Sequence, residues 1–391
     1  MKSNIRSHFI QFQTGSTEEQ IILTCKIALL SCMILSLPLW IPNLSSFPQI
    51  PLLSIFESIP FTLQLILSSI LYFILFFSLF AKERNKVFLV FTLLMIIAVF
   101  FDFQRLQPWL YYFTIFVLVL IKFKDSESGI TAIQFSLAFI YIFSGLQKFN
   151  AGFANEIFDW LVQPITSHLP KSVSNQINDF WILAPVIELS SGFGLLFTKT
   201  QQLSKWTLVS MHFFILLMIG PFGHNSNLAV WPWNLAFMTF LVLLFKPKHS
   251  FSLSHFISIE NKFLKYSFIL LFSILPFLSF VNHWPKHFSA ALYSGNKIKS
   301  YIYLSDELVE HLPLRVQQIV DRSDNRINTT SWAMNELNVA IYPTHKAHIG
   351  LFKSICESSP SQDQLLVLQL FDEPDYLTGE RTEKTYFCDD F

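Results

Sequence analysis

The sequence predicts an all-α polytopic membrane protein, with about nine transmembrane helices followed by a small extracytoplasmic α/β cap at the C-terminus. The composition supports this fold class, because 52% of the 391 residues are hydrophobic, 14% are charged and 44 are Phe. The charged fraction is well below the roughly 25% that soluble domains usually carry. The mean hydropathy is positive, at +0.45. The two other observations are the recurrence of long apolar runs and the distribution of Lys and Arg between the loops.

Nine apolar runs have lengths suited to a bilayer, although some of them are short. A helix that crosses the hydrocarbon core needs about 20 residues, at a rise of 1.5 Å per residue. They lie at about 27–41, 61–81, 87–103, 109–121, 131–148, 181–198, 206–221, 229–245 and 266–283. The third and fourth runs are separated only by residues 102–108, which predicts a tight hairpin. No small-residue cleavage site follows the first run, so it is predicted to be a retained span and not a signal peptide.

Lys and Arg occur in alternate loops, and cytoplasmic loops carry the excess of these residues in membrane proteins. The residues concerned are Lys2, Arg6, Lys26, Lys82, Arg84, Lys86, Lys122, Lys124, Lys199, Lys205, Lys246, Lys248, Lys262 and Lys265. Residues 43–60 and 222–228 contain none. The N-terminus is therefore predicted to be cytoplasmic, in an inner or plasma membrane, and an odd number of spans places the C-terminal cap outside.

Two longer segments lie outside the apolar runs. Residues 149–180 have apolar side chains at helix-like spacing, with Pro164 and Pro170 as breaks, and are predicted to lie on the membrane surface. From about residue 282 charged residues become frequent, and short β-like runs lie at 339–342, 365–370 and 384–388. The chain is thus predicted to divide into a membrane domain, 1–285, and an extracytoplasmic domain, 286–391.

The four cysteines divide evenly between these domains. Cys25 and Cys32 are seven residues apart on one helix face, where they are predicted to be packing residues. Cys356 and Cys388 lie in the predicted external domain, where an oxidising compartment would allow them to pair. A disulfide and two free thiols are both open at this point, because the sequence gives no distance between the two sulfur atoms.

Polar residues in or near the spans gather at the predicted outer side. Lys148 ends the fifth run, and Glu188 and His212 each lie about 10 to 12 Å from the outer rim at the helical rise. Other polar or aromatic groups at that side are Asp102, Arg105, His224, Asn227, Trp231, Trp233 and Asn234. An outward-opening pocket is predicted, with Lys148 as a base, Glu188 and His212 as its proton partners, and the other seven residues as substrate-binding groups.

A quinol is the membrane-soluble molecule that best suits such a pocket. A lysine acts as a base only if burial lowers its pKa towards neutrality, and a rim of Phe and Trp supplies a low dielectric constant. Mid-span carboxylates are rare and usually functional.

Each residue also has a plain structural interpretation. Lys148 can extend to water from a helix end, and Asp102 and Arg105, three residues apart, can form a hairpin-capping pair. Glu188 can bond to Ser190 or to a neighbouring helix. His212 can join two helices, and the two tryptophans can belong to an aromatic belt. Small residues are typical of a close-packing helix face, as in Ser190, Ser191, Gly192 and Gly194.

Several classes of function are not indicated. The chain has no Lys/Arg-rich block that would neutralise phosphates, so nucleic acid is not an expected partner. It has no His-Glu-x-x-His, Walker A, Gly-x-Gly-x-x-Gly or Gly-x-Ser-x-Gly pattern. No metal site is predicted, and His212 and His224 are twelve residues apart, which is no recognised ligand spacing.

Residues 141–150, Tyr-Ile-Phe-Ser-Gly-Leu-Gln-Lys-Phe-Asn, resemble a segment of the membrane domain of vitamin K-dependent γ-glutamyl carboxylases and their bacterial relatives, the horizontally transferred transmembrane domain family. The resemblance implies that Lys148 is the base that deprotonates a reduced quinone. DoxX-like and methylamine-utilisation membrane proteins are also similar, in residues 144–148 and in Glu188 followed by Gly192.

The chain departs from the carboxylase pattern in three places. The paired lysines are here Gln147 and Lys148, and Gln107-Pro108-Trp109 replaces an Asn-His. The tail of about 110 residues is shorter than the lumenal domain that holds protein substrates. The resemblance therefore implies binding of a quinone-like molecule more than carboxylation of a protein glutamate.

The resulting hypothesis is an integral membrane protein that binds a small lipophilic redox molecule at its outer face, as a quinol-dependent oxidoreductase or carboxylase-like enzyme, with a reduced quinone as the only cofactor suggested. The alternative is a non-catalytic scaffold, in contact with membrane lipid, whose cap binds an extracytoplasmic protein partner. A transporter is not favoured, because the two halves show no repeat and no pair of interrupted helices.

Overall fold

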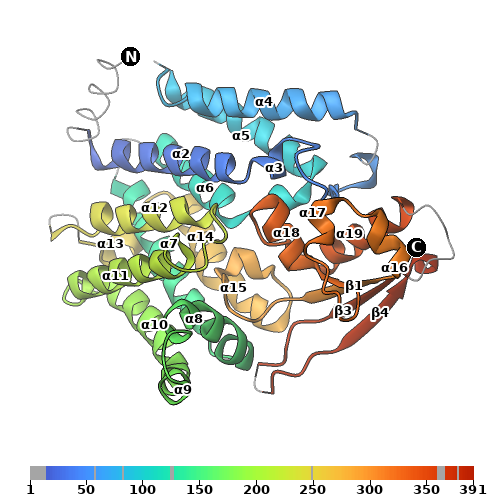
Figure 1. Cartoon of the computed structure of the whole chain (residues 1–391). Helices are drawn as coiled ribbons and strands as arrows, with labels where there is room; N and C mark the ends of the chain where they lie inside the picture. The colour runs from blue at the N-terminus through green and yellow to red at the C-terminus, as the bar shows by residue number, and fades with distance from the viewer. Residues whose placement is uncertain are drawn as a thin grey trace.

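The computed structural model describes residues 15–56, 59–81, 83–123, 127–247, 250–358, 366–376 and 378–391. A bundle of long helices occupies one part of the molecule, and a small sheet with short helices is attached at one end of it (Figure 1). Part of the predicted loop-charge pattern lies outside the described residues, namely Lys2, Arg6, Lys82, Lys124 and Lys248.

Each of the nine predicted apolar runs contains helix in the described residues. The helices are α2 (Thr17–Leu35) with α3 (Leu37–Trp40), α4 (Phe61–Phe77), α5 (Arg84–Phe101), α6 (Pro108–Lys122), α7 (Glu127–Leu146), α10 (Leu183–Leu195), α11 (Gln201–Ile219), α12 (Val230–Leu244), and a last run of α14 (Lys262–Ile269), a π-helix (Leu270–Ile274) and α15 (Leu275–Leu278). Residue chemistry explains several starts: Ser16 and Glu19 form a capping box before α2, and Pro108 opens α6.

Four of the described helical segments are long and apolar enough to cross a membrane: Arg84–Phe101, Glu127–Leu146, Gln201–Ile219 and Lys262–Val281. Phe61–Phe77, Pro108–Lys122 and Val230–Leu244 are shorter apolar helices. The protein is therefore mostly helical and has helices suited to a membrane by length and composition. The number of crossings stays a prediction.

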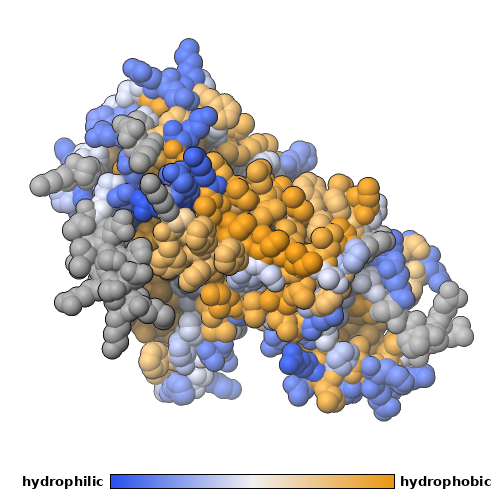
Figure 2. Space-filling view, turned by 90° about the horizontal axis from the view of Figure 1, so that it is seen from above, coloured by the Kyte–Doolittle hydropathy of each residue, from blue (hydrophilic) through white to orange (hydrophobic). Residues whose placement is uncertain are grey.

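A broad hydrophobic band lies on the face of the molecule that carries α4, with hydrophilic residues on either side of it (Figure 2). Exposed side chains of α4 and α5 that contribute to the apolar surface include Phe73, Phe76, Leu93 and Ile96. An exposed apolar surface of this extent is unfavourable in water, so this face is suited to contact with lipid chains.

Residues 149–180 form short helices, as their apolar spacing predicts: a π-helix (Phe153–Phe158), α8 (Asp159–Thr166) and α9 (Lys171–Asp179). Pro170 directly precedes α9, but the prediction of a break at Pro164 is wrong, because Pro164 lies inside α8. Proline leaves the carbonyl four residues earlier without its helical donor. Here that carbonyl, of Trp160, accepts a hydrogen bond from His224 Nε2 at 2.6 Å instead.

Helices α7 and α10 approach closely because each has a glycine at their crossing. A Cβ at Gly145 would lie 2.7 Å from the Leu189 backbone nitrogen, and a Cβ at Gly192 would lie 2.7 Å from that of Ile142. The predicted close-packing face is therefore correct for Gly192, which is buried. Gly194 meets α11 in the same way, since its Cβ would clash with Ser204.

Gly192→Ala is expected to destabilise the protein by about 1–3 kcal/mol, because the extra methyl group forces α7 and α10 apart. Gly129→Ala is the matched control on α7, since a Cβ there meets Leu120 and Phe123 at an ordinary distance of 3.4 Å or more. Thermal unfolding of both variants in detergent tests this. Equal melting temperatures would contradict the packing argument.

The cap contains a four-stranded antiparallel sheet in the order β2-β1-β3-β4. Its elements are β1 (Lys299–Leu304), α16 (Asp306–His311), α17 (Leu314–Gln317), β2 (Arg326–Asn328), α18 (Thr329–Leu337), α19 (His345–Ser358), β3 (Leu366–Phe371) and β4 (Glu383–Phe387). The other short elements in the described residues are α13 (Leu253–Ile257) and 3₁₀ turns at Ser54–Phe56, Phe103–Arg105, Phe180–Ile182, Ser279–Val281, Lys286–Ser289 and Cys388–Asp390.

The predicted strands at 365–370 and 384–388 correspond to β3 and β4; residue 365 itself lies outside the described residues. The strand predicted at 339–342 is wrong. This segment is buried but forms no ladder, because its backbone bonds to a helix-end turn: the Tyr342 N–H donates to Gln104 Oε1 at 2.7 Å. Strands β1 and β2 were not predicted, and β2 has only three residues.

The cap packs against the helix ends that carry the predicted outer polar residues. Gln107 Nε2 donates to Ala340 O at 3.4 Å, and Asn150 Nδ2 donates to Ser294 O at 2.8 Å. A disulfide joins Cys356 at the end of α19 to Cys388 after β4, which decides the alternative that the sequence left open. Cys25 and Cys32 are free and buried in α2, consistent with a packing role.

Candidate functional site

A cavity of about 900 Å³ lies among α7, α8, α10, α11 and α12. The three predicted catalytic residues line it, each from a different element: Lys148 from the turn after α7, Glu188 from α10 and His212 from α11. Tyr141 and Ser144 of α7 and Asn234 of α12 also line it. The cavity walls are otherwise mainly apolar.

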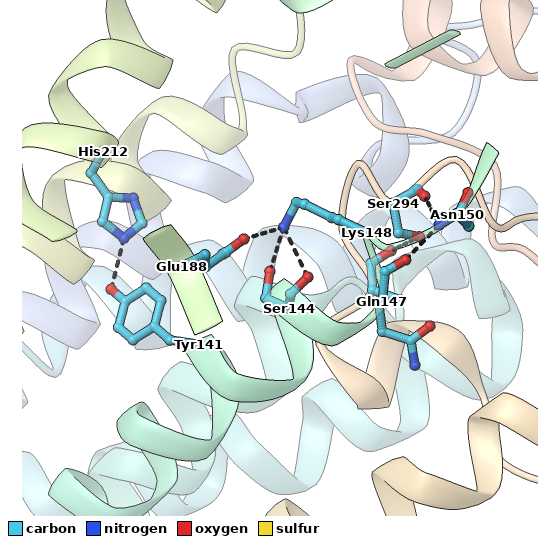
Figure 3. A network of polar contacts seen from close by, with 9 residues as sticks. Tyr141, Ser144, Gln147, Lys148, Asn150, Glu188, His212 and Ser294 are labelled. Atoms are coloured by element: carbon cyan, nitrogen blue, oxygen red, sulfur yellow. Dashed lines mark hydrogen bonds and ion pairs between the residues drawn. The ribbon is translucent and has the colours of Figure 1, made fainter. Parts of the chain in front are cut away.

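Lys148 and Glu188 form a buried ion pair across the crossing of α7 and α10. Lys148 Nζ lies 2.6 Å from Glu188 Oε2, and the two side chains are only 12% and 9% exposed. The ammonium also donates to Ser144 Oγ at 2.6 Å and to Ser144 O at 3.2 Å (Figure 3). Lys148 therefore turns back over α7 and does not extend to water as a helix-end lysine can.

The local sequence explains this arrangement. Ser144 and Lys148 are four residues apart, which places them on the same side of a helical turn. Glu188 lies one turn before Gly192, so the glycine contacts that bring α10 against α7 also bring the carboxylate to the lysine. Asn150 holds the turn after α7 by donating to Gln147 O and Ser294 O (Figure 3).

A second polar group in the cavity is a hydrogen-bonded chain of Tyr141, His212 and Asn234. The Tyr141 hydroxyl lies 2.7 Å from His212 Nε2, and His212 Nδ1 lies 2.7 Å from Asn234 Oδ1. Asn234 Nδ2 donates to Val230 O, so the amide oxygen faces the histidine. These contacts fit a neutral imidazole that donates from Nδ1 and accepts the Tyr141 hydroxyl proton at Nε2.

Tyr141 and Ser144 were not predicted as site residues, although both lie in the stretch that resembles the carboxylases. The signal was available in their spacing, since positions 141, 144 and 148 follow one face of a helix. The apolar character of the stretch masks this signal, because a tyrosine in an apolar helix can also be a packing residue.

The mouth of the cavity is apolar. Leu203 and Trp206 of α11 line the cavity and are 74% and 54% exposed. Leu183 and Ile187 of α10 and Ile165 of α8 are further lining residues with large exposed areas. The cavity thus opens sideways through a hydrophobic surface between α10 and α11, where a lipid-soluble molecule can enter.

The predicted substrate-binding residues divide between two cavities. Trp233 and Asn234 line the first, whereas His224, Asn227 and again Trp233 line a second cavity of about 680 Å³ under the cap. Trp231 lines neither; its indole N–H donates to Ser226 O at 3.2 Å.

Asp102 and Arg105 line neither of these two cavities, so their role as substrate-binding residues stays a prediction. Asp102 accepts from the backbone N–H groups of Gln104 and Ile50. Arg105 is fully buried and donates to backbone carbonyls at the ends of α3 and α5. Asp102 thus connects the turn after α5 to the segment that contains Ile50, and Arg105 connects that turn to α3 and α5. No ion pair joins the two residues within the described chain.

Among the residues that the structure describes, no three His, Cys, Asp or Glu side chains come together as metal ligands. The polar groups described above for the first cavity are one ion pair and one Tyr–His–Asn chain. No protein-family model, curated protein or solved structure gives a significant match to this chain.

Proposed function

We propose that the protein binds a reduced quinone or a similar lipid-soluble molecule with an acidic hydroxyl group in the first cavity, and that the Lys148–Glu188 pair takes up its proton. One observation carries the proposal: a buried ion pair lines an apolar cavity whose mouth is formed by exposed hydrophobic side chains. Ionisable groups in such surroundings are costly unless they have a function or a partner.

The size and walls of the cavity suit a ring. A volume of about 900 Å³ is within the usual range for small-molecule sites, roughly 300–1,000 Å³. Tyr112, Trp233 and Phe237 line the cavity and contact one another, with ring centroids 5.7 Å apart for Tyr112 and Trp233 and 4.2 Å apart for Trp233 and Phe237. Aromatic faces stack favourably on a flat conjugated ring, while an apolar tail can leave through the mouth between α10 and α11.

The proton transfer uses the pair as a unit. In the proposed step, the proton on Lys148 Nζ passes along the 2.6 Å hydrogen bond to Glu188 Oε2. The neutral amine then accepts the hydroxyl proton of the bound molecule and becomes an ammonium again. The net change is one proton moved from the hydroxyl to Glu188, which leaves an oxyanion beside the Lys148 ammonium.

The Tyr141–His212–Asn234 chain supplies a second polar group for the bound ring. When the neutral His212 ring accepts the Tyr141 hydroxyl proton at Nε2, the Tyr141 oxygen retains lone pairs for a donor on the ligand. His212 thus orients Tyr141 in this scheme, which modifies the role of proton partner that the sequence suggested.

The proposal includes the finer membrane topology: nine crossings, a cytoplasmic N-terminus and the cap outside. It is supported by contacts among the helix ends predicted to be cytoplasmic, where Lys26 Nζ donates to Ser78 O and Arg84 O and Arg84 pairs with Glu19. Residues 141–150 resemble a segment of the carboxylase-related membrane domains. The proposal is that this protein binds the same class of ligand as those domains, a reduced quinone.

Filling the cavity tests whether it binds the molecule. Thr207→Trp, which places an indole in the cavity from α11, is expected to weaken binding of decylubiquinone or menadione at least about 10-fold, because the ligand and the new ring compete for space. Thr239→Trp on α12 is the matched control, since Thr239 does not line the cavity. Titration by fluorescence quenching in nanodiscs measures both. Equal affinity in Thr207→Trp and the parent protein would reject the site.

A further inference from the structure

The second cavity, of about 680 Å³, lies between the cap and the helix ends. It shares a wall with the first cavity, because the residues that line both are Ile157, Val230, Trp233, Leu292 and Tyr293. The two cavities differ at their rims. Exposed polar side chains, including Glu156, Ser331 and Asn335, line the second one, so it is accessible from water.

Lys297 provides the unusual group in this cavity. It lines the wall, and within the described part of the chain its ammonium has no hydrogen-bond or ion-pair partner; only its backbone carbonyl is bonded, by Arg381 Nη1 at 2.6 Å. Burial, together with the nearby charge of Lys148, lowers the pKa of Lys297 to about 8. Lys297 is half-buried, so its ammonium is partly desolvated and an anion in the cavity would stabilise its charge.

The other ionisable groups of the wall do not supply that counter-charge. Glu156 is paired with Lys299. Burial and the charge of Lys297 hold the pKa of His287 well below its usual range, so this imidazole is neutral, and His287 Nδ1 has no partner among the described residues. With Glu156 and Lys299 cancelling, Lys297 leaves a single positive charge on the wall of the cavity.

We propose that the second cavity binds a small water-soluble carboxylate through the ammonium of Lys297. One lysine balances one negative charge, which favours a carboxylate over a phosphate, because phosphate sites usually combine several cationic or backbone donors. The volume is large enough for a carboxylate on an aromatic or branched skeleton, and the wall residues Val339 and Ile341 are apolar. The proposal concerns binding alone and does not depend on proton transfer in the first cavity.

The test uses the purified full-length protein in detergent, with sodium benzoate, sodium acetate or inorganic phosphate replacing chloride at constant ionic strength. Benzoate is expected to raise the melting temperature and to slow acetylation of Lys297, read by peptide mass spectrometry. Lys297→Met is expected to weaken benzoate binding about 10- to 100-fold, since a charge-assisted hydrogen bond is lost. This variant removes an unpaired charge and is expected to fold; Lys297→Gln serves as a second variant.

The matched control is the double variant Glu156→Gln with Lys299→Met, which removes the ion pair but leaves the net charge of the wall unchanged. It is expected to bind benzoate as the parent protein does. An equal benzoate response in the parent and in both Lys297 variants would overturn the proposal. A response to phosphate without one to benzoate would overturn the choice of carboxylate, and no response to any of the three anions would overturn the site.

Discussion

Replacing Lys148 with Met is expected to lower quinol-dependent oxygen consumption about 10²- to 10⁴-fold, the range over which a positioned general base usually contributes. The reason is that a quinolate loses electrons to dissolved oxygen much faster than a neutral quinol, and Lys148 Nζ is the proposed acceptor of the quinol proton. Reduced menadione with the protein in nanodiscs, followed by an oxygen electrode and corrected for the reaction without protein, gives the rate.

Two controls separate proton transfer from binding and folding. Lys199→Met removes an exposed lysine at the far end of α10 and is expected to leave the rate unchanged. Oxidised menadione has no hydroxyl proton, so its affinity for Lys148→Met is expected to stay within a few-fold of the parent value. The double variant Lys148→Met with Glu188→Gln, which leaves no unpaired charge, is expected to be equally inactive.

Retention of the parent rate in folded Lys148 variants would refute the proton-transfer role. It would then favour the alternative of a scaffold, in which the ion pair only joins α7 to α10 and the cap binds a protein partner. Loss of quinone binding together with the rate would indicate that Lys148 holds the ligand instead of deprotonating it.

Removing one member of the buried pair is expected to destabilise the protein by about 3–5 kcal/mol, because the remaining charge stays buried without a partner. Glu188→Gln and Lys148→Met are the two single variants. The double variant is expected to lose much less than their sum, since both charges leave together. Unfolding in a detergent–denaturant mixture, arranged as a double-mutant cycle, measures the coupling free energy.

The pair Lys86–Glu83 is the control for this cycle. Its side chains are 80% and 62% exposed at the start of α5, so water screens the charges and Lys86→Met is expected to change the stability little. Additive losses at Lys148 and Glu188 would show that the two groups are not coupled and would contradict the 2.6 Å pairing.

Apolar composition predicted the helices well because it is a local property. Nine runs predicted from hydropathy alone contain helix, and the residues singled out as oddly placed charges, Lys148 and Glu188, are the ones that meet in a cavity. Failures occurred where a residue's partner is distant in the chain. Pro164 continues a helix because His224 bonds the carbonyl it frees, and Tyr342 bonds Gln104 in place of a strand.

Asp102 and Arg105 show the limit most clearly. Their position at a helix end was correct, but the direction of each side chain was not available from spacing. Arg105 turns inward to three backbone carbonyls, which give its buried guanidinium the acceptors that it needs. Lys297 was not singled out at all, because a lysine in a polar tail is unremarkable until the cap folds over it.

Local residue chemistry was enough to predict a mostly helical protein, the positions of its apolar helices and the presence of a lysine, a carboxylate and a histidine among them. Tertiary structure alone decided that Lys148 pairs with Glu188, that His212 bonds Tyr141, and that a second cavity lies beneath the cap. Helices could be predicted from the sequence because the apolar character of a segment depends only on that segment's own residues. Contacts between helices depend also on how the helices are rotated and how closely they approach. Here Gly145 and Gly192 allow α7 and α10 to approach closely enough for Lys148 and Glu188 to form an ion pair.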